Sequence, residues 1–446
     1  MEESLADIEM EFSLEEEPEY ESSGMSRMLP EEIRERTVDR FLGAGNRARE
    51  VVIFPQYYGL LFCWALEEYL KFIGAKIKRI IGNSEGEPFY TEVYTDYEDK
   101  KNILIDGQIL ATINNKNIVI TISIDSIRCD MLMFESLEKN SELIKEIAEG
   151  VEECAKTNNF YRGKNLEFRG RLKMVKLKGK AWSNVVIDEE IKNEIRKNTI
   201  GFIKNLKLWE ELGIPPKRGI LLEGEPGTGK TIICKALMTE ADCITCISAS
   251  AYSIGTRGYL NDLFELAQDL SPCLLFIEDI DLIGQDRASL GSSVNPVLVA
   301  LLNAMDGIEE KAHILTIATT NCLEALDKAL RERPSRFDRV IKIDLPDEAQ
   351  RREIISRLCE KIKLDEESQI ILARRSEGLT PAQIQEALFT FVIENEEPEA
   401  CRESFAVNIK TIEKTLSKIK AKNTTALGFK CINGSSAEAG KKTQMA

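Results

Sequence analysis

The chain has 446 residues, 43% of them hydrophobic and 30% charged, with a formal net charge of −16. This composition is typical of a globular protein, its acidic balance disfavours a nucleic-acid partner, and its length predicts roughly two to four domains. The one histidine, His313, excludes zinc proteolysis at an H-E-x-x-H motif, and no run reaches the roughly 18 apolar residues that span a bilayer, which predicts no membrane insertion.

The amino-terminal segment, residues 1–25, is predicted to be a disordered acidic tail. Residues 1–22 hold ten acids and no base, so the segment repels itself and offers little apolar surface to bury. A solvated leader is the favoured interpretation, and a docking arm for a basic partner is the alternative. The acidic start also lacks the features of a secretory signal.

Residues 26–164 are predicted to form a separate α+β domain without recognisable chemistry. Two helices are expected first, at 30–49 and 51–74, and β-branched runs separated by turn residues follow. Asp106-Gly107 predicts a tight hairpin turn. The strands are expected at 102–106, 108–113, 118–124 and 126–134, and a last helix at 136–157.

Two changes of pattern follow residue 164. Residues 165–181 form a basic, strand-rich connector, which we interpret as a solvated strand face rather than a phosphate- or nucleic-acid-binding patch. In residues 182–346, apolar runs alternate with helices, which predicts an α/β fold with a parallel sheet and helices on both faces. Residues 347–420 predict a small helical lid, and residues 421–446 a flexible tail. The strands of the α/β domain are expected at 220–222, 243–248, 273–278, 314–319 and 340–345.

Eleven cysteines are scattered along the chain, most of them in apolar stretches. This usage is typical of reduced thiols in an intracellular, cytoplasmic protein. Cys243 and Cys246 form a C-x-x-C, but no second pair stands at zinc spacing. A structural strand is therefore favoured over a redox or metal site.

A complete phosphate-binding loop, G-E-P-G-T-G-K-T, lies between an apolar run and a helix-like segment. A strand that ends at a glycine-rich turn and enters a helix directs backbone N–H groups and the positive helix terminus at polyphosphate oxygens. Lys230 is expected to reach the β- and γ-phosphates, and the Thr231 hydroxyl to bind Mg²⁺. The predicted ATP-binding residues are Gly224, Glu225, Pro226, Gly227, Thr228, Gly229, Lys230, Thr231 and Ile232.

A second part of the predicted site is an apolar strand, Leu274 to Ile277, that ends in Glu278 and Asp279. Such a strand directs one carboxylate towards Mg²⁺ and the other towards an attacking water. Forty-seven residues separate Lys230 from Glu278, so the pair lies downstream of the phosphate-binding loop.

Together these motifs resemble the AAA ATPases, and the resemblance extends from Trp182 to about Ile419. Leu274 to Asp281 is similar to that family's L-L-F-I-D-E-I-D with the two acids exchanged. By position, Glu278 would bind the metal and Asp279 would polarise water, and the exchange leaves the reverse assignment open. Ala318 to Asn321 resembles the first sensor, in which Asn321 would contact the γ-phosphate or the attacking water.

The same resemblance implies a site shared between subunits. Residues 329–339 are similar to A-L-L-R-P-G-R-F-D-R, which makes Arg336 and Arg339 expected arginine fingers for the neighbouring subunit. The extra residue here and Ser335 in place of glycine leave a plain salt-bridge role as the alternative. In the lid, Ala382 occupies the place of the second-sensor arginine.

Residues before the phosphate loop point to one branch of the family. Trp182 to Asp188 and the exchanged acids look most like the mitochondrial Rieske-protein translocases, which carry a transmembrane anchor. By that likeness, the backbone at Val186 and Ile187 would face the adenine. The lid and finger motifs instead resemble those of soluble remodelling ATPases.

The family's pore loop has two rival tyrosines here. An aromatic residue between the second strand and the next helix grips polypeptide in such rings, and Tyr252 is favoured over Tyr259. Packing of the tyrosine on the following helix is the alternative.

The resemblance predicts a Mg²⁺-dependent ATPase that forms a ring, expected to be a homohexamer, and remodels proteins that its N-terminal domain recognises directly or through an adaptor. A nucleotide-dependent scaffold with slow hydrolysis and a nucleic-acid-dependent motor are the alternatives.

Overall fold

The computed structural model describes residues 30–83, 87–124, 130–177, 182–215, 217–257, 259–282, 296–307, 312–321, 337–359 and 366–394. The chain divides into two compact units at Lys176, except that Cys243–Ile247 belong with the first unit. The finer domain limits expected from the sequence stay predictions. In the described part of the chain, no helix combines the length and the apolar character that crossing a membrane requires.

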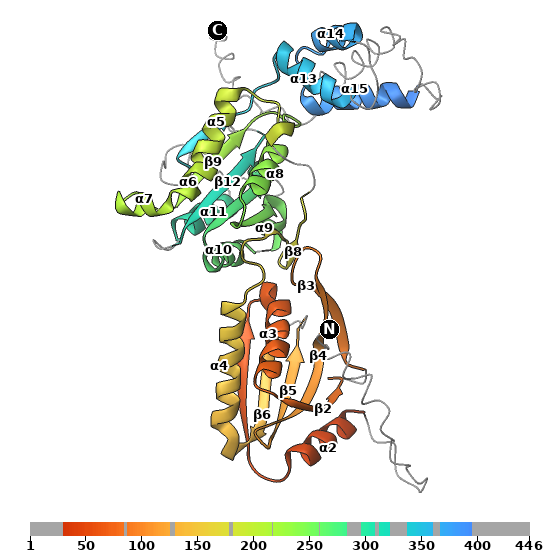
Figure 1. The fold of residues 1–446 in the computed structure, drawn as a ribbon, viewed down its shortest axis with the longest axis vertical. Helices are drawn as coiled ribbons and strands as arrows, with labels where there is room; N and C mark the ends of the chain where they lie inside the picture. Colours follow the sequence, from red (N-terminus) through yellow and green to blue (C-terminus); the bar gives the residue numbers. More distant parts are fainter. Residues whose placement is uncertain are drawn as a thin grey trace, which may run out of the picture. The chain divides into compact units, whose positions relative to one another are not determined.

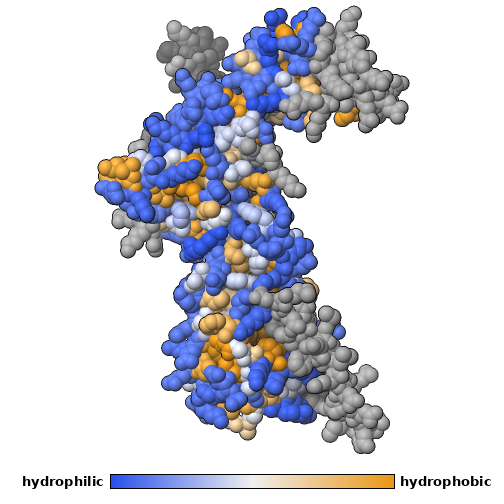
Figure 2. Space-filling model, viewed as in Figure 1, coloured by the Kyte–Doolittle hydropathy of each residue, from blue (hydrophilic) through white to orange (hydrophobic). Residues whose placement is uncertain are grey.

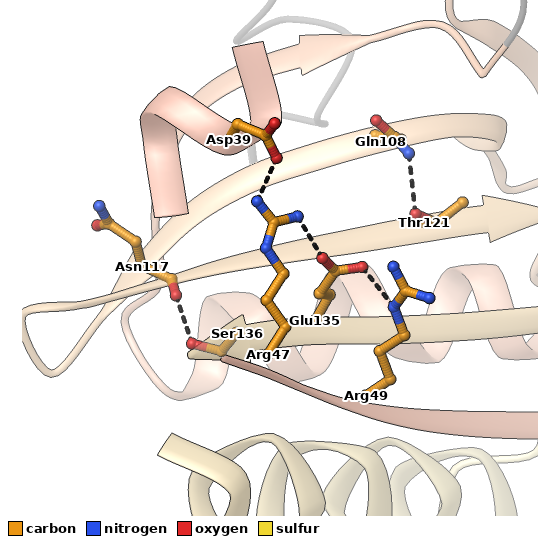
Figure 3. Close-up of polar contacts among 8 residues, drawn as sticks. All are labelled: Asp39, Arg47, Arg49, Gln108, Asn117, Thr121, Glu135 and Ser136. Carbon is orange, nitrogen blue, oxygen red and sulfur yellow. Dashed lines mark hydrogen bonds and ion pairs between the residues drawn. The ribbon is translucent and has the colours of Figure 1, made fainter. Parts of the chain in front are cut away.

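The first unit is built on an antiparallel sheet in the order β1-β6-β5-β4-β2, with β3 also paired to β4. Helices α3 and α4 lie on one face, and α2 lies on the other (Figures 1 and 3). The elements are α2 (Pro30–Leu42), β1 (Arg47–Phe54), α3 (Gly59–Phe72), β2 (Lys76–Ile81), β3 (Phe89–Tyr94), β4 (Lys100–Ile113), β5 (Lys116–Ser123), β6 (Asp130–Leu137), α4 (Ser141–Thr157), β7 (Asn165–Phe168) and β8 (Leu172–Met174).

Alternation along the strands places apolar side chains on both faces of this sheet. Ile109, Ile120 and Phe134 stand opposite one another on neighbouring strands and are fully buried. On the other face, Val38 and Leu42 of α2 pack in one cluster with Leu110 and Val119. Because burial of one such side chain contributes about 1.5–3 kcal/mol, both faces stabilise the sheet.

The expected helix at 51–74 is wrong in its first part, and the expected helix at 30–49 is too long. Helix α2 ends at Leu42, and residues 47–54 form strand β1. Gly43 and Gly45 interrupt the helix with positive φ angles of 84° and 143°. The β-branched Val51, Val52 and Ile53 that follow suit a strand paired with β6.

The expected hairpin turn at Asp106-Gly107 is also wrong, because β4 continues through it. Gly107 has φ 153°, and a Cβ atom there would stand 2.9 Å from the carbonyl oxygen of Ile81. This glycine therefore permits a close approach between β4 and the end of β2. The turn that does occur lies at Asn114 and Asn115, both with positive φ, between the strands expected at 108–113 and 118–124.

Strand β1 is joined to β6 and α2 by ion pairs (Figure 3). Arg47 donates from Nη1 to Glu135 Oε1 at 2.6 Å and also pairs with Asp39 of α2. Arg49 Nε donates to the other oxygen of Glu135 at 2.8 Å. The cations of β1 are thus already paired within the unit.

The second unit contains strands in the order β13-β9-β12-β11, followed by residues 248–250 of β10, and helices flank them (Figure 1). The pairs β11–β12, β12–β9 and β13–β9 are parallel, so the α/β architecture expected from the sequence is confirmed. Its elements are α5 (Glu189–Asn198), α6 (Ile200–Lys204), α7 (Leu206–Glu211), β9 (Arg218–Glu223), α8 (Lys230–Glu240), β10 (Thr245–Ser250), α9 (Ala251–Arg257), α10 (Leu260–Asp269), β11 (Cys273–Glu278), α11 (Pro296–Asp306), β12 (Ile314–Thr320) and β13 (Arg339–Lys342).

A helical lid follows the sheet and consists of α13 (Glu348–Cys359), α14 (Glu366–Arg375) and α15 (Pro381–Glu394). Ile355, Leu372 and Ile384 belong to its buried core, one from each helix. The buried Arg351 donates to the carbonyl oxygens of Ala373 at 2.7 Å and Pro346 at 2.8 Å. These bonds connect α13 to the end of α14. The helix expected at 407–419 lies outside the described residues.

Candidate functional site

The glycine-rich loop lies at the carboxyl edge of the parallel sheet. Strand β9 ends at Glu223, which stands opposite Thr320 at the end of β12, and α8 begins at Lys230. Gly227 and Gly229 have φ angles of 85° and 105°, a left-handed backbone that side-chain-bearing residues rarely adopt. The loop therefore has the strand–turn–helix context that a phosphate site requires.

Lys230 is buried at the centre of this loop, with 6% of its surface exposed. Its Nζ donates to the carbonyl oxygens of Gly224 at 2.7 Å and Glu225 at 3.1 Å. A third bond, 2.8 Å long, goes to Oδ1 of Asn321. Burial lowers the pKa of Lys230, and the charge of Asp279 opposes that effect. The ammonium group is thus held where polyphosphate oxygens can replace its oxygen partners.

The two acids after β11 have different partners. Glu278 Oε2 accepts from the Thr231 hydroxyl at 3.2 Å, whereas Asp279 Oδ1 accepts from Asn321 Nδ2 at 3.2 Å. The Asp279 backbone has φ 56°, and its N–H donates to Thr319 Oγ1 at 3.0 Å. A non-glycine residue in this conformation is costly, and such strain clusters at functional sites.

A third acid, Asp281, holds the end of β12 in place and was not singled out as a site residue. Its Oδ1 accepts from the Asn321 backbone N–H and from the Thr320 hydroxyl, both at 3.0 Å. Asp281 therefore positions Asn321, which in turn accepts from Lys230. The sequence signal was available, since Asp281 is the last acid of the motif that contains Glu278 and Asp279.

A cavity of about 490 Å³ opens beside the loop and is bounded by both the sheet and the lid. This volume suits a nucleotide-sized ligand. Most of the predicted ATP-binding residues line this cavity, together with Asp279 and Asn321. The cavity-lining residues include Val186, Ile187, Pro226, Gly227, Thr228, Gly229, Lys230, Thr231 and Ile232, whereas Gly224, Glu225 and Glu278 do not line it.

The lid supplies cavity residues that sequence reasoning missed. Ile354, Arg357 and Leu358 come from α13, and Pro381 and Gln385 come from α15. Leu358 and Val186 also pack on the lid core. These side chains have no motif of their own, because what they share is a position in space between separate helices.

The loop touches the lid at Gly227. The Gly227 carbonyl oxygen accepts from the Ala382 N–H at 3.3 Å. A Cβ atom at Gly227 would stand 2.9 Å from Ala382 Cβ and 2.9 Å from Thr380 Oγ1. The absence of a side chain at 227 thus lets α15 rest on the phosphate loop.

We expect Gly227→Ala to displace the lid from the loop and to weaken nucleotide binding by at least about tenfold, since steric overlap and backbone strain each cost on the order of 1 kcal/mol or more. Hydrogen exchange at the Ala382 amide should accelerate in the variant. Gly229→Ala is the matched control, because its φ of 105° is equally unfavourable but nothing lies within 4 Å of the added Cβ. Unchanged Ala382 exchange in Gly227→Ala would show that the lid does not depend on this contact.

The residues present fit a nucleoside triphosphate with Mg²⁺. Lys230 is placed to bind phosphate oxygens, and the Thr231 hydroxyl and Glu278 carboxylate lie together as oxygen ligands for a hard cation. Pro226, Val186 and Leu358 offer apolar surface to a base. Bound Mg²⁺ would neutralise charge developing on the transferred phosphoryl group.

Other predicted residues are not brought into this cavity. Arg339 is exposed on β13 and does not line it. Arg336 lies outside the described residues. Tyr252 is 57% exposed on α9, and Tyr259 is half-buried directly before α10.

The C-x-x-C pair and the basic connector are the two weaker candidates from the sequence. Cys246 is buried in β10, and Cys243 is exposed before it. No cluster of three metal-binding side chains occurs in the described ranges. In the basic connector, Lys176 pairs with Glu98 and Arg169 with Glu167, which supports the interpretation as a solvated strand face.

A glycine-rich loop between a parallel strand and a helix, with paired acids and an asparagine at the neighbouring strand ends, defines a P-loop nucleoside triphosphatase. Residues 220–345 match the family described as "ATPase family associated with various cellular activities (AAA)". This region of the chain is thus similar to the AAA ATPases, whose ligands are ATP and Mg²⁺.

Several known proteins are similar to part of the chain. The proteasome-activating nucleotidase of Sulfurisphaera tokodaii is 36% identical over 254 residues, which are 54% of this chain and 62% of that protein. That of Saccharolobus solfataricus is 35% identical over 209 residues, 45% of this chain and 53% of that protein. The ATP-dependent zinc metalloprotease FtsH of Metamycoplasma arthritidis is 38% identical over 221 residues, 47% of this chain and 29% of that protein. The match thus spans no more than 62% of these relatives. The likeness to the Rieske-protein translocase branch stays a prediction.

Proposed function

We propose that this protein is a Mg²⁺-dependent ATPase that works as a ring, a homohexamer, and remodels or unfolds protein substrates in the cytoplasm. The chain of contacts from Lys230 through Asn321 to Asp279 carries the proposal, because it connects a phosphate-binding cation to a carboxylate at the cavity wall. Reduced thiols at the described cysteines support a reducing intracellular location.

Hydrolysis is assigned to the two acids by their surroundings. Asp279 lines the cavity, and Asn321 holds its carboxylate, which suits activation of a water at the γ-phosphate. Glu278 contacts Thr231 instead, which suits the metal side. These contacts support the assignment that the family resemblance implies.

Completion of the site by a neighbouring subunit is supported by the positions of the arginines. Within the described residues, Arg357 is the arginine that lines the cavity, and it is bonded to the Ser183 carbonyl oxygen and to Glu353. Arg339 is exposed on β13, where it can reach another subunit. We assign Arg339, with Arg336, to the adjacent site as arginine fingers.

Exposed apolar residues support self-association of the second unit. Leu208, Leu212 and Ile214 are 45%, 61% and 40% exposed, and Figure 2 shows hydrophobic residues gathered over α7. Patches of this kind on a water-soluble surface commonly mark protein interfaces.

A protein substrate is proposed from the relatives and from the pore tyrosine. Proteasome-activating nucleotidases are named for an action on a proteolytic partner, and FtsH is named as an ATP-dependent protease. Tyr252 is exposed on the helix that follows β10, as a residue that grips polypeptide must be. We assign Tyr252 to the pore, Tyr259 to packing before α10, and substrate or adaptor recognition to the N-terminal domain.

Turnover measured with different polymers tests this function against its alternatives. We expect ATP hydrolysis to rise several-fold with a permanently unfolded protein and to be unchanged by DNA or RNA. Stimulation by nucleic acid alone would favour the nucleic-acid motor. An assembled ring that binds ATP without turnover would favour a nucleotide-dependent scaffold.

A further inference from the structure

The two terminal strands of the N-terminal sheet, β1 and β2, differ in how their charges are paired. Each has a neighbouring strand on one side only within the described residues. The arginines of β1 are paired with Glu135 and Asp39 (Figure 3). On β2, Lys76, Lys78 and Arg79 are exposed, and in the described part of the chain none of the three has an ion pair.

The two faces of β2 have opposite character. Lys76 and Arg79 stand opposite Thr112 and Leu110 of β4, on the face that α2 partly covers. Ile77 and Ile80 stand opposite Ala111 and Ile109, on the face of α3 and α4, and both isoleucines are only half-buried. A segment paired with this edge would therefore meet cations on one face and unfinished apolar packing on the other.

The acidic leader has the matching pattern. Residues 8–14 read I-E-M-E-F-S-L, so apolar side chains alternate with Glu9, Glu11 and Ser13. In an extended chain this alternation places the apolar residues on one side and the acids on the other. The net charge of the leader is opposite to that of the β2 edge.

The leader is also attached at the right place. It leads into Pro30, where α2 begins, and α2 packs on the sheet with Ile81 of β2 against the same cluster. The 15 residues between Leu14 and Pro30 can span up to about 50 Å, which exceeds the roughly 20 Å length of α2. Residues 8–14 can therefore reach β2 within one chain.

We propose that residues 8–14 of this chain bind the free edge of β2 in cis, with Glu9 and Glu11 beside Lys76 and Arg79 and the apolar residues beside Ile77 and Ile80. Main-chain hydrogen bonds supply affinity in such strand addition, and the alternating side chains set the register. An exposed edge strand is a template for other chains, so the leader also blocks that use. This contact is independent of the nucleotide site.

Hydrogen exchange of the backbone amides in residues 76–81 of the full chain tests the contact. Glu9→Lys with Glu11→Lys should accelerate exchange there by about tenfold, because two cross-strand charge pairs become repulsive. Further substitution of Lys76→Glu and Arg79→Glu in that variant should restore slow exchange. Glu19→Lys with Glu21→Lys is the matched control, since it changes the leader's charge equally outside the alternating segment.

Exchange in β5 is followed in each variant to confirm that the sheet stays folded. Identical exchange of β2 in the wild type and in Glu9→Lys with Glu11→Lys overturns the proposal and leaves the lysines as a guard against pairing between copies. Protection that grows with protein concentration overturns it in favour of a second copy. Protection that appears only on addition of an unfolded protein assigns the edge to a substrate instead.

Discussion

Asp279→Asn is expected to abolish ATP turnover while leaving ATP affinity within a few-fold of the wild type. The carboxylate lies at the cavity wall, and its loss removes the group that accepts a proton from the attacking water. An amide retains an oxygen that can accept from Asn321 Nδ2, so the local structure should survive. General bases of this kind contribute about 10²- to 10⁴-fold, and steady-state hydrolysis will measure the loss.

Glu278→Gln is the matched comparison, because the two acids are adjacent and each substitution removes one charge. We expect it to raise the Mg²⁺ concentration needed for half-maximal turnover, since Glu278 contacts the Thr231 hydroxyl. If Asp279→Asn instead shifts the Mg²⁺ requirement and Glu278→Gln abolishes turnover at saturating Mg²⁺, then the two roles are reversed.

Lys230→Ala is expected to remove ATP binding at concentrations that saturate the wild type. The substitution deletes the ammonium group of Lys230, together with its bonds to Gly224, Glu225 and Asn321. Charge-assisted bonds to phosphate are about twice as strong as neutral ones, so a loss of about 100-fold or more in affinity is expected. Titration with a fluorescent ATP analogue measures it.

The control for that titration is Lys204→Ala, which removes an exposed lysine of α6 from the same unit. Thermal unfolding of both variants separates loss of binding from loss of fold. Wild-type affinity in a folded Lys230→Ala protein would contradict the assignment of the phosphate loop.

Much of the candidate nucleotide site can be read from the sequence, because the motifs that make it up are local. Lys230 and Thr231 are fixed by a short glycine-rich loop, and Glu278, Asp279 and Asn321 follow buried strands that end at one edge of the sheet. Parallel pairing then brings these strand ends together without further information.

Patterns failed where a tertiary contact decides the structure. Val51 to Ile53 suit an apolar helix or a strand equally, and pairing with β6 selects the strand. Gly107 resembled a turn residue, but the close approach of Ile81 keeps it inside β4. Pro381 and Gln385 reach the cavity only because the lid folds over the loop. None of these outcomes depends on neighbouring residues alone.

The central claim is an ATP-hydrolysing ring in which each site needs a neighbour, and mixing two inactive variants tests it most directly. Lys230→Ala subunits lack the phosphate-binding lysine but keep Arg339. Arg339→Ala subunits keep Lys230 but lack the arginine offered to the neighbouring site. We predict that each variant alone hydrolyses little ATP and that a mixture of the two recovers activity. In rings assembled at random from equal amounts of both variants, up to about a quarter of the sites should combine an intact Lys230 with an intact Arg339 from the neighbour. Full activity of Arg339→Ala alone, or a mixture in assembled rings that stays as inactive as its components, would contradict the shared site.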